Sequence, residues 1–574
     1  MISFIKKHRY LLILLLAIIP TISFLLKPNE YWNMHDDMQV IRQLSMEKCL
    51  KDGQIPCRWS PDLGYGYGYP LFNFYPPMPY FVGQVFRTFG FNYLTTVKLT
   101  ALTQIVLSTL AMYLLASSIF GSFGGLVSAI FYAYAPYHAL NIYVRGAMNE
   151  AWAAVFFPLI FHFSRKLIID KKISSLVLFS LSFSGLLLSH NPMALTFTLF
   201  LFIWVLFFLY QNYRSIKDTL QTILKLFISA IFSLSLTAFY TIPVLLETKY
   251  VQIETMFQNY YHWSVHFTSL KQLFISNYWG DGASVWGQDD RMSFMVGYLH
   301  WLLPLFLILY FIFSFVKTKK ISTISFVSLL TALMGFFAAF MTHERSAFIW
   351  LLISPIQKIQ FPWRFLNHSV FLLSISVGII PSLFSSFKKY SLYLSSLILL
   401  IVVFLNISYF TPITHGPISE QQKLSGKAWV NQVTSGIYDY LPKTARIAAQ
   451  GPAKDFVDSL SPEVKYQVTN AKKGTNWQMF DLFLEKSTNV TLPILSYPIF
   501  KVYDNNQLID YSVEPELGRL VVSLSSGNHQ LFIKLTDTPD RTISNIVSLL
   551  AWLSLLIYLL INYVIKPRCQ FHQR

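Results

Sequence analysis

Residues 193–210, MALTFTLFLFIWVLFFLY, carry no charged side chain and are apolar over almost their whole length. A helix needs about 20 mostly apolar residues to cross roughly 30 Å of hydrocarbon, because lipid offers the backbone no hydrogen-bond partners. This stretch therefore predicts a membrane-spanning helix.

The composition of the whole chain agrees with a membrane protein. Of its 574 residues, 54% are hydrophobic and 13% are charged, which is about half of the roughly 25% charged residues in soluble domains. This composition excludes an ordinary soluble enzyme and predicts a polytopic α-helical membrane protein. We expect twelve spans, near residues 10–27, 97–116, 122–138, 150–164, 173–189, 193–210, 221–245, 294–316, 321–341, 365–385, 391–410 and 544–565.

The net charge of +17 would suggest a nucleic-acid partner if Lys and Arg formed one basic face. They do not, so we expect no nucleic acid. With the N-terminus inside, the charged short loops obey the positive-inside rule, which predicts cytoplasmic termini. We expect the plasma membrane, and an organelle membrane is the alternative. The predicted cytoplasmic segments contain 17 basic residues and the two acidic residues Asp170 and Asp218, so they account for +15 of the net charge. The basic residues are Lys6, Lys7, Arg9, Arg165, Lys166, Lys171, Lys172, Arg214, Lys217, Lys317, Lys319, Lys320, Lys388, Lys389, Lys566, Arg568 and Arg574.

Two outer regions are long enough to hold chemistry, namely residues 28–96 and 411–541. We therefore expect a transmembrane module over 1–410, an extracytoplasmic, mostly-β domain over 411–541, and a final span with a cytoplasmic tail over 542–574. Residues 498–536 alternate apolar and polar side chains, which predicts antiparallel strands of a small β-sandwich. Turn signals interrupt the alternation at Asp504-Asn505-Asn506, Leu517-Gly518-Arg519 and Ser526-Gly527-Asn528. Trp429 and Trp477 fit the sandwich core or a stacking surface for sugars.

The first outer loop contains two adjacent carboxylates, Asp36 and Asp37. One interpretation is a cap on a short helix that begins near Met38. The other is a general base with a neighbour that holds it or binds a divalent cation.

Downstream, the segment GYGYGYPLFNFYPPMPY (64–80) contains Tyr69 and Tyr75. Their aromatic rings either stack on a sugar or belong to a belt of tyrosines at the membrane interface. Residues 76–90 are too short to span and are interrupted by Arg87, so we expect a short interfacial helix there. Cys49 and Cys57 flank a turn sequence in the same loop. They form a disulfide or remain buried thiols.

The other candidate site residues lie at the predicted outer ends of spans. Arg145 is placed to pair with Glu150 or to bind a donor phosphate, for which its bidentate guanidinium is suited. Arg364 either binds a lipid phosphate or anchors its span at the membrane interface. His190 and Asn191 precede a span and fit a turn or a substrate contact.

The anchor helix, the acidic pair in the long outer loop after it and Glu150 at the outer end of the third span together resemble the GT-C superfamily of membrane glycosyltransferases. More closely, RWSPDLGYGYGYPLFNFYPPMPY (58–80), RGAMNE (145–150), LLLSHNPM (186–193) and FPWRFL (361–366) are similar to the bacterial membrane-protein family called "6-pyruvoyl-tetrahydropterin synthase-related", which is itself similar to the YfhO-like proteins. The label misleads, because pterin synthases are small soluble enzymes with a His-ligated zinc.

The GT-C resemblance implies an inverting transfer from a polyprenyl-phosphate sugar to a glycan, lipid or protein acceptor in the cell envelope. Asp36 or Asp37 would then be the base. Glu150 would orient the acceptor or complete a site for Mg²⁺ or Mn²⁺ with the two aspartates.

Two other functions fit the same sequence. The first is a transporter or flippase of lipid-linked sugars, although transporters generally place ionisable residues in the middle of spans. The second is a non-catalytic membrane protein whose sandwich binds envelope polysaccharide.

Overall fold

The structure is a computed structural model that describes residues 2–287, 290–383 and 388–565. The chain divides into two compact units, each built from segments far apart in sequence. Unit 1 comprises Met1–Gln39, Leu94–Ile231 and Phe257–Ser419, and unit 2 comprises Val40–Tyr93, Phe232–Met256 and Glu420–Arg574. The domain boundaries expected from the sequence stay predictions. Residues 566–574 of the expected cytoplasmic tail lie outside the described residues.

Nine helices among the described residues are long and apolar enough to cross a membrane. Two shorter apolar helices, Arg9–Ile22 and Ile173–Ser189, coincide with further predicted spans. The polytopic helical class is therefore confirmed, and the count of twelve stays a prediction. The nine are Tyr93–Ala133, Met148–Asp170, Asn191–Gln211, Ile216–Leu236, Tyr298–Thr318, Thr323–Phe340, Pro362–Leu383, Tyr390–Tyr409 and Pro539–Asn562.

Helix α6 (Tyr93–Ala133) covers two predicted spans in one 41-residue element. Its path is broken at Gly121, where φ is 76° and ψ is 170°, a conformation that glycine adopts without steric cost. The span predicted over 221–245 is wrong in extent. The chain leaves helical geometry at Thr237, so the region forms α11 (Ile216–Leu236) and the short α12 (Ala238–Glu247).

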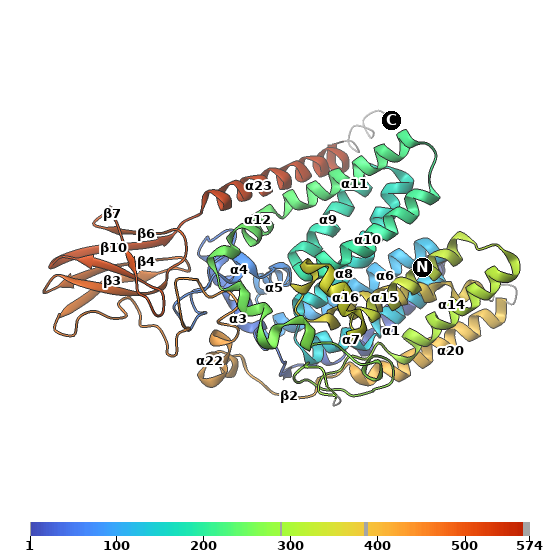
Figure 1. Ribbon diagram of the computed structural model, residues 1–574, viewed down its shortest axis with the longest axis horizontal. Coiled ribbons are helices and arrows are strands. Elements are labelled where there is room, and N and C mark those ends of the chain that lie inside the picture. The colour runs from blue at the N-terminus through green and yellow to red at the C-terminus, as the bar shows by residue number, and fades with distance from the viewer. Residues whose placement is uncertain (1, 288–289, 384–387, 566–574) are drawn as a thin grey trace. The chain divides into compact units, whose positions relative to one another are not determined.

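The helices of unit 1 run as a bundle in which α8 (Met148–Asp170), α9 (Ile173–Ser189) and α10 (Asn191–Gln211) lie side by side (Figure 1). Between α8 and α9 the contact is close, because a Cβ at Gly185 would lie 2.2 Å from the ring of Phe156. The remaining helices of this unit include α1 (Ile2–Ala17), α2 (Ile19–Ile22), α7 (Pro136–Ala139), α13 (Leu270–Phe274), α14 (Tyr298–Thr318), α15 (Thr323–Phe340), α16 (Ala347–Leu352), α17 (Ser354–Gln357), α18 (Phe365–Ser376), α19 (Ile380–Leu383) and α20 (Lys388–Asn406).

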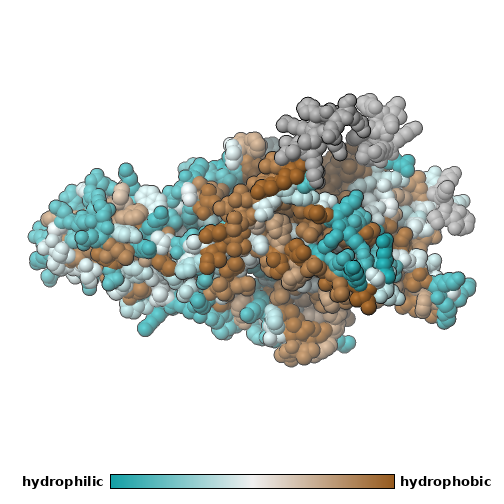
Figure 2. Space-filling model, turned by 90° about the horizontal axis from the view of Figure 1, so that it is seen from above, coloured by the Kyte–Doolittle hydropathy of each residue, from teal (hydrophilic) through white to brown (hydrophobic). Residues whose placement is uncertain are grey.

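The helices expose apolar side chains, as lipid-facing helices should. Figure 2 shows a broad hydrophobic surface over helices on the face in view. The described exposed side chains include Leu224 and Phe227 of α11, Phe313 of α14, and Leu549 and Ile557 of α23 (Pro539–Leu559). Water would disfavour such continuous apolar surfaces, so they agree with a lipid environment.

Unit 2 holds two antiparallel sheets, as expected for its C-terminal part. One sheet has the strand order β3-β4-β10-β6-β7 and the other β5-β9-β8. Apolar side chains of both sheets, such as Leu482, Val490, Val522 and Ile533, share one buried core, which confirms a sandwich. The strands are β3 (Tyr466–Lys473), β4 (Trp477–Leu484), β5 (Thr488–Leu495), β6 (Phe500–Asp504), β7 (Gln507–Ile509), β8 (Ser512–Val513), β9 (Arg519–Leu524) and β10 (Gly527–Leu535).

The predicted turn signals of the sandwich lie where strands reverse. Asn505 and Asn506 join β6 to β7 with positive φ of 48° and 66°, which suits a tight hairpin. Gly518 precedes β9 with φ of 73°, and a Cβ there would lie 2.7 Å from the backbone nitrogen of Ala445. Gly527 begins β10 with φ of 126°.

The first loop contributes short helices to unit 2, including α3 (Gln39–Lys51), α4 (Leu71–Phe74) and α5 (Met78–Thr88). Helix α5 has 11 residues, which confirms a short helix rather than a span. It is tied to α3 by Arg87, whose Nε donates to Glu47 at 2.5 Å. Burial opposes ionisation of Glu47, but hydrogen bonds from Arg87 and Lys51 outweigh it and lower the pKa of Glu47 to about 2.

Candidate active site

The loop that carries the acidic pair is hydrogen-bonded to the segment before α8. The backbone N–H of His35 donates to the carbonyl of Val144 at 2.9 Å, and that of Asp36 donates to the carbonyl of Arg145 at 2.8 Å. Before them, β1 (Tyr31–Trp32) pairs with β2 (His415–Gly416). The backbone thus fixes Asp36 beside Arg145.

Gly146 permits this close approach. Its φ is +68°, and a Cβ there would lie 2.7 Å from the Sδ atom of Met34. The side chain of Gln39 also donates to the carbonyl of Gly146 at 2.6 Å. A side chain at position 146 would strain the backbone and push the acidic loop away from RGAMNE.

Arg145 and Glu150 form a buried ion pair, with Nη1 at 3.0 Å from Oε2 and side-chain exposures of 6% and 1%. The hydroxyl of Tyr137 donates to the other carboxylate oxygen at 2.6 Å, and Arg145 donates to Oδ1 of Asn141 at 2.5 Å. The guanidinium also lies 4.3 Å from the ring centroid of Trp363. A buried charge needs such partners.

Burial and neighbouring charges shift the pKa values of Arg145 and Tyr137 in this cluster. Burial disfavours the charged form of Arg145, but the charge of Glu150 outweighs it and raises the pKa of Arg145 above its usual value. Burial and the charge of Glu150 also raise the pKa of Tyr137 well above its usual value. Tyr137 therefore stays protonated, and its hydroxyl donates a hydrogen bond to Glu150.

Arg364 joins the cluster from the start of α18. Its Nε lies 3.7 Å from Oε2 of Glu150, and its Nη1 donates to the carbonyl of Ile359 and to Oε1 of Gln360 at 2.6 and 3.1 Å. One turn later, Asn367 donates to the carbonyl of Glu150 at 3.1 Å. Two arginines distant in sequence thus share one carboxylate.

His190 lies at the same end of the bundle, between α9 and α10. Its Nδ1 accepts the backbone N–H of Met193 at 3.2 Å, which is the turn role weighed from the sequence, and Asn191 is the first residue of α10. Burial, with the charges of Arg364 and Arg145, lowers the pKa of His190 well below its usual value. His190 is therefore neutral near pH 7.

In contrast to Glu150, Asp36 is open to solvent. The side chains of Asp36 and His35 are 47% and 50% exposed, and Nδ1 of His35 lies 3.0 Å from Oδ1 of Asp36. This hydrogen bond raises the pKa of His35. Asp37 follows in the same loop and is half-buried. An accessible carboxylate therefore lies beside a buried cluster of two arginines and one glutamate.

Tyr69 and Tyr75 belong to unit 2, where their hydroxyl groups form hydrogen bonds with other residues of that unit. The hydroxyl of Tyr69 donates to the carbonyl of Gly436 at 2.9 Å and accepts the N–H of Tyr440 at 2.6 Å. The hydroxyl of Tyr75 accepts from Arg42 at 2.8 Å. Their role as substrate contacts stays a prediction.

The arrangement of Asp36, Asp37 and Glu150 does not fit a site for a divalent metal ion. Glu150 already accepts from Arg145 and Tyr137, and a cation placed on it would face two guanidinium groups. In the part of the chain that the structure describes, no group of three or more His, Cys, Asp and Glu is arranged to hold a metal ion. We therefore derive no step through a metal, and dependence on Mg²⁺ or Mn²⁺ stays a prediction.

The structure thus brings together Asp36, Arg145, Glu150 and Arg364, with His190 nearby. Sequence reasoning missed Tyr137, Asn141 and Asn367, which hold the cluster in place. Residues 137, 141 and 145 are four apart, and that spacing puts side chains on one helical face. Asn367 offered no comparable signal, since its link to Glu150 joins distant segments.

Helix α8 separates this cluster from a basic region. Glu150 is in the first turn of α8, whereas Arg165 and Lys166 lie near its end and Lys171 is its C-cap. The candidate site and these basic residues therefore lie at opposite ends of one candidate span.

Comparison with known proteins gives a family match and distant likenesses. A curated but uncharacterized protein of Lactococcus lactis subsp. cremoris (strain MG1363) is 22% identical over 245 residues, which are 42% of this chain and 40% of that protein. The chain therefore spans less than half the length of this relative.

The similar solved structures include two glycosyltransferases with low TM-scores. The Archaeoglobus fulgidus oligosaccharyltransferase, tethered with an acceptor peptide, has a TM-score of 0.43 and 13% identity over 79% of this chain and 61% of that one. The arabinofuranosyltransferase AftD from Mycobacteria has a TM-score of 0.40 and 13% identity over 72% and 28% of the two chains.

The family match covers residues 72–287, which contain the RGAMNE and LLLSHNPM segments of the expected resemblance. Over these residues the chain matches the membrane-protein family described as the 6-pyruvoyl-tetrahydropterin synthase related domain.

Proposed function

We propose that the protein is an integral-membrane glycosyltransferase that moves a sugar from a polyprenyl-phosphate donor to an acceptor outside the cytoplasm. One observation carries the proposal. The Asp36 N–H donates to the carbonyl of Arg145 at 2.8 Å, which places an accessible carboxylate next to a cluster with two arginines. A base and an anion-binding group are the two parts that transfer from a phosphate carrier needs.

The base is Asp36, or Asp37 beside it. As the acceptor hydroxyl attacks the anomeric carbon, its proton passes to the carboxylate. The bond from the anomeric carbon to the carrier phosphate breaks on the opposite face, so the configuration inverts. The half-exposed side chain of Asp36 supports this role, because a substrate hydroxyl must reach it.

Arg364 stabilises the departing lipid phosphate, which gains negative charge as the bond breaks. It is only 13% exposed on its side chain, and a guanidinium keeps its charge and offers several donors to phosphate. Arg145 and Glu150 are positioning residues. Their pair orients the cluster, since Arg145 already contacts Glu150, Asn141 and Trp363.

The same proposal includes an orientation of the protein in the plasma membrane. The N- and C-termini are cytoplasmic, and the long loops with the acceptor lie outside. The basic residues near the end of α8, opposite Glu150, support this orientation through the positive-inside rule. A polyprenyl-phosphate sugar exposed at the outer leaflet would then reach the site.

Deletion and complementation in the native host test the function. The deletion strain should accumulate a polyprenyl-phosphate sugar and lose a surface glycan, both measured by mass spectrometry. Wild-type protein and the control Asp170→Asn, altered at an exposed residue at the end of α8, should restore both. Asp36→Asn or Asp37→Asn should fail at equal membrane abundance. An unchanged donor pool in the deletion strain would contradict the proposal.

A further inference from the structure

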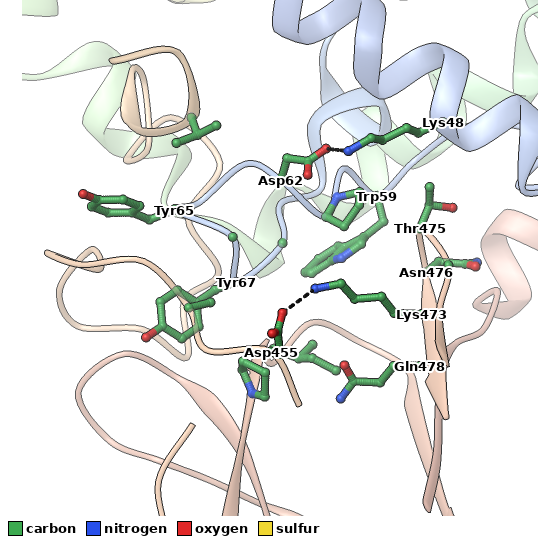
Figure 3. A pocket seen from close by; sticks show the side chains of 18 of the residues that line it. Lys48, Trp59, Asp62, Tyr65, Tyr67, Asp455, Lys473, Thr475, Asn476 and Gln478 are labelled. Atoms are coloured by element: carbon green, nitrogen blue, oxygen red, sulfur yellow. Dashed lines mark hydrogen bonds and ion pairs between the residues drawn. The ribbon is translucent and has the colours of Figure 1, made fainter. Parts of the chain in front are cut away.

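Unit 2 contains a cavity of about 730 Å³ that the proposed transfer chemistry does not use. One wall comes from residues 48–68 of the first loop and the other from segments within residues 429–500 (Figure 3). Asp36, Glu150 and Arg364 are not among its lining residues. Its volume lies within the roughly 300–1,000 Å³ of small-ligand sites.

The two walls are joined by specific contacts. The carboxylate of Asp52 accepts the backbone N–H of Thr475 at 2.6 Å and the indole N–H of Trp477 at 3.2 Å. The disulfide between Cys49 and Cys57 closes the short loop that carries Asp52. The shape of the cavity is thus set by covalent and hydrogen-bonded structure.

The repeated glycines of GYGYGY shape the first wall. Gly64, Gly66 and Gly68 have positive φ of 64°, 87° and 88°, which other residues rarely adopt. A Cβ on Gly68 would lie 2.4 Å from the indole of Trp59. Glycine at these positions packs the loop on Trp59, and Tyr65 of the same loop lines the cavity.

The lining combines aromatic faces with amide groups. Tyr65, Trp429 and Trp477 are each partly exposed and line the cavity, and so do Asn476 and Gln478. Gln478 is 5% exposed, and its Nε2 atom is buried with no hydrogen-bond partner among the described residues. A buried donor without a partner is unfavourable, and a ligand acceptor would satisfy it.

The lining is nearly balanced in charge, because it holds four lysines and three aspartates. Each of the four lysines that line the cavity already has an acceptor, two of them drawn in Figure 3. The pairs are Lys48 with Asp62 at 2.6 Å, Lys51 with Glu47 at 2.5 Å, Lys454 with the carbonyl of Asp458 at 2.7 Å and Lys473 with Asp455 at 3.1 Å.

We propose that this cavity binds a segment of a neutral oligosaccharide, separately from the transfer site. Sugar rings present an apolar face that stacks on aromatic side chains and hydroxyl edges that bind amides. The carboxylates beside Lys48, Lys51 and Lys473 offset their charges and so weaken the attraction for phosphate or sulfate groups. The aromatic faces and the amide of Gln478 therefore select a neutral sugar over a charged polymer. The inference does not depend on the proposed reaction.

The test measures binding of maltotetraose, cellotetraose, chitotetraose and xylotetraose to the full-length protein in nanodiscs, by saturation-transfer NMR and calorimetry. At least one should bind at concentrations up to about 10 mM. Tyr65→Ala and Trp429→Ala should each weaken binding roughly tenfold. The control Tyr466→Ala removes an exposed aromatic outside the cavity and should leave binding unchanged.

Two further variants separate the outcomes. Gln478→Met should weaken binding without lowering the thermal unfolding midpoint, because it removes a buried donor that the fold leaves without a partner. Asp36→Asn should bind as wild type does, so that failure of the transfer proposal leaves this result intact. Three results would each overturn the inference. They are failure of all four sugars to bind, binding by the Tyr65 and Trp429 variants that equals that of the wild type, and preference for a hyaluronan tetrasaccharide or a peptide.

Discussion

The Nη1 atom of Arg145 lies 3.0 Å from Oε2 of Glu150, and both side chains are almost fully buried. The pair joins the segment before α8 to the first turn of that helix. Because Asp36 is hydrogen-bonded through its backbone to Arg145, the pair also fixes the position of the proposed base. Its loss should affect both stability and transfer.

Replacement of Glu150 tests this coupling. Glu150→Gln leaves two buried guanidinium groups without their shared anion, so we expect a loss of about 3 kcal/mol in the free energy of unfolding and a strong fall in kcat. Thermal unfolding in detergent measures the first effect. The matched control is Glu254→Gln, which removes a partner of the exposed pair with Lys443 and should cost less than about 1 kcal/mol. Equal losses in the two variants would contradict a buried, essential pair.

A glycine at position 146 should be needed for transfer activity, because a larger residue there would collide with Met34. Gly146→Ala places a Cβ 2.7 Å from Sδ of Met34 and should lower transfer by displacing the Asp36 loop. Gly90→Ala is the matched control, since Gly90 also has a positive φ, of 88°, but a Cβ there would meet no atom within 4 Å. Both variants carry backbone strain, and only the first should lose activity beyond its loss of stability. Similar specific activities would refute the role of the contact.

The contact of His35 with Asp36 should depend on pH. The folded state raises the pKa of His35 above its ordinary value of about 6.5, so the contact stabilises the fold fully below about pH 6.5 and is lost as the pH rises through the raised pKa. Both groups are half-exposed, which limits the effect to less than about 1 kcal/mol.

An imidazole NMR titration measures this pKa directly. The midpoint of His35 should lie above about 6.5 in the wild type and fall towards that value in Asp36→Asn. A midpoint that is the same in both proteins would show that Asp36 does not cause the shift.

The Cys49–Cys57 disulfide is tested by mass spectrometry. Alkylation of the unfolded protein without reductant should modify neither cysteine, and reduction should add two labels to the peptides that contain them. Two alkylated thiols before reduction would contradict the bond. Substitution of both cysteines by serine should also weaken oligosaccharide binding, because the bond closes the loop that carries Asp52.

The sequence predicted much of the fold, because hydropathy and turn chemistry are local. Apolar length predicted the polytopic helical class, and Gly518 and Gly527 marked strand reversals. The span over 221–245 was misjudged because hydropathy does not register the break in helical geometry at Thr237.

The candidate site was predictable only in part. Pairing with Glu150 was one of two roles expected for Arg145, and the structure shows that pair. The approach of Arg364 to Glu150 joins segments more than two hundred residues apart. Periodicity carries no information on such contacts. The contact of Met34 with Gly146 was hidden for the same reason.

Release of polyprenyl phosphate by the purified protein tests the central claim most directly. Protein in liposomes is incubated with the host's lipid extract and envelope glycan, and free polyprenyl phosphate is measured by mass spectrometry. Wild type and Asp170→Asn should release it in proportion to glycosylated acceptor. Asp36→Asn or Asp37→Asn should reduce release by at least about a hundredfold, as expected for loss of a general base. Full release by both variants would contradict the proposed reaction.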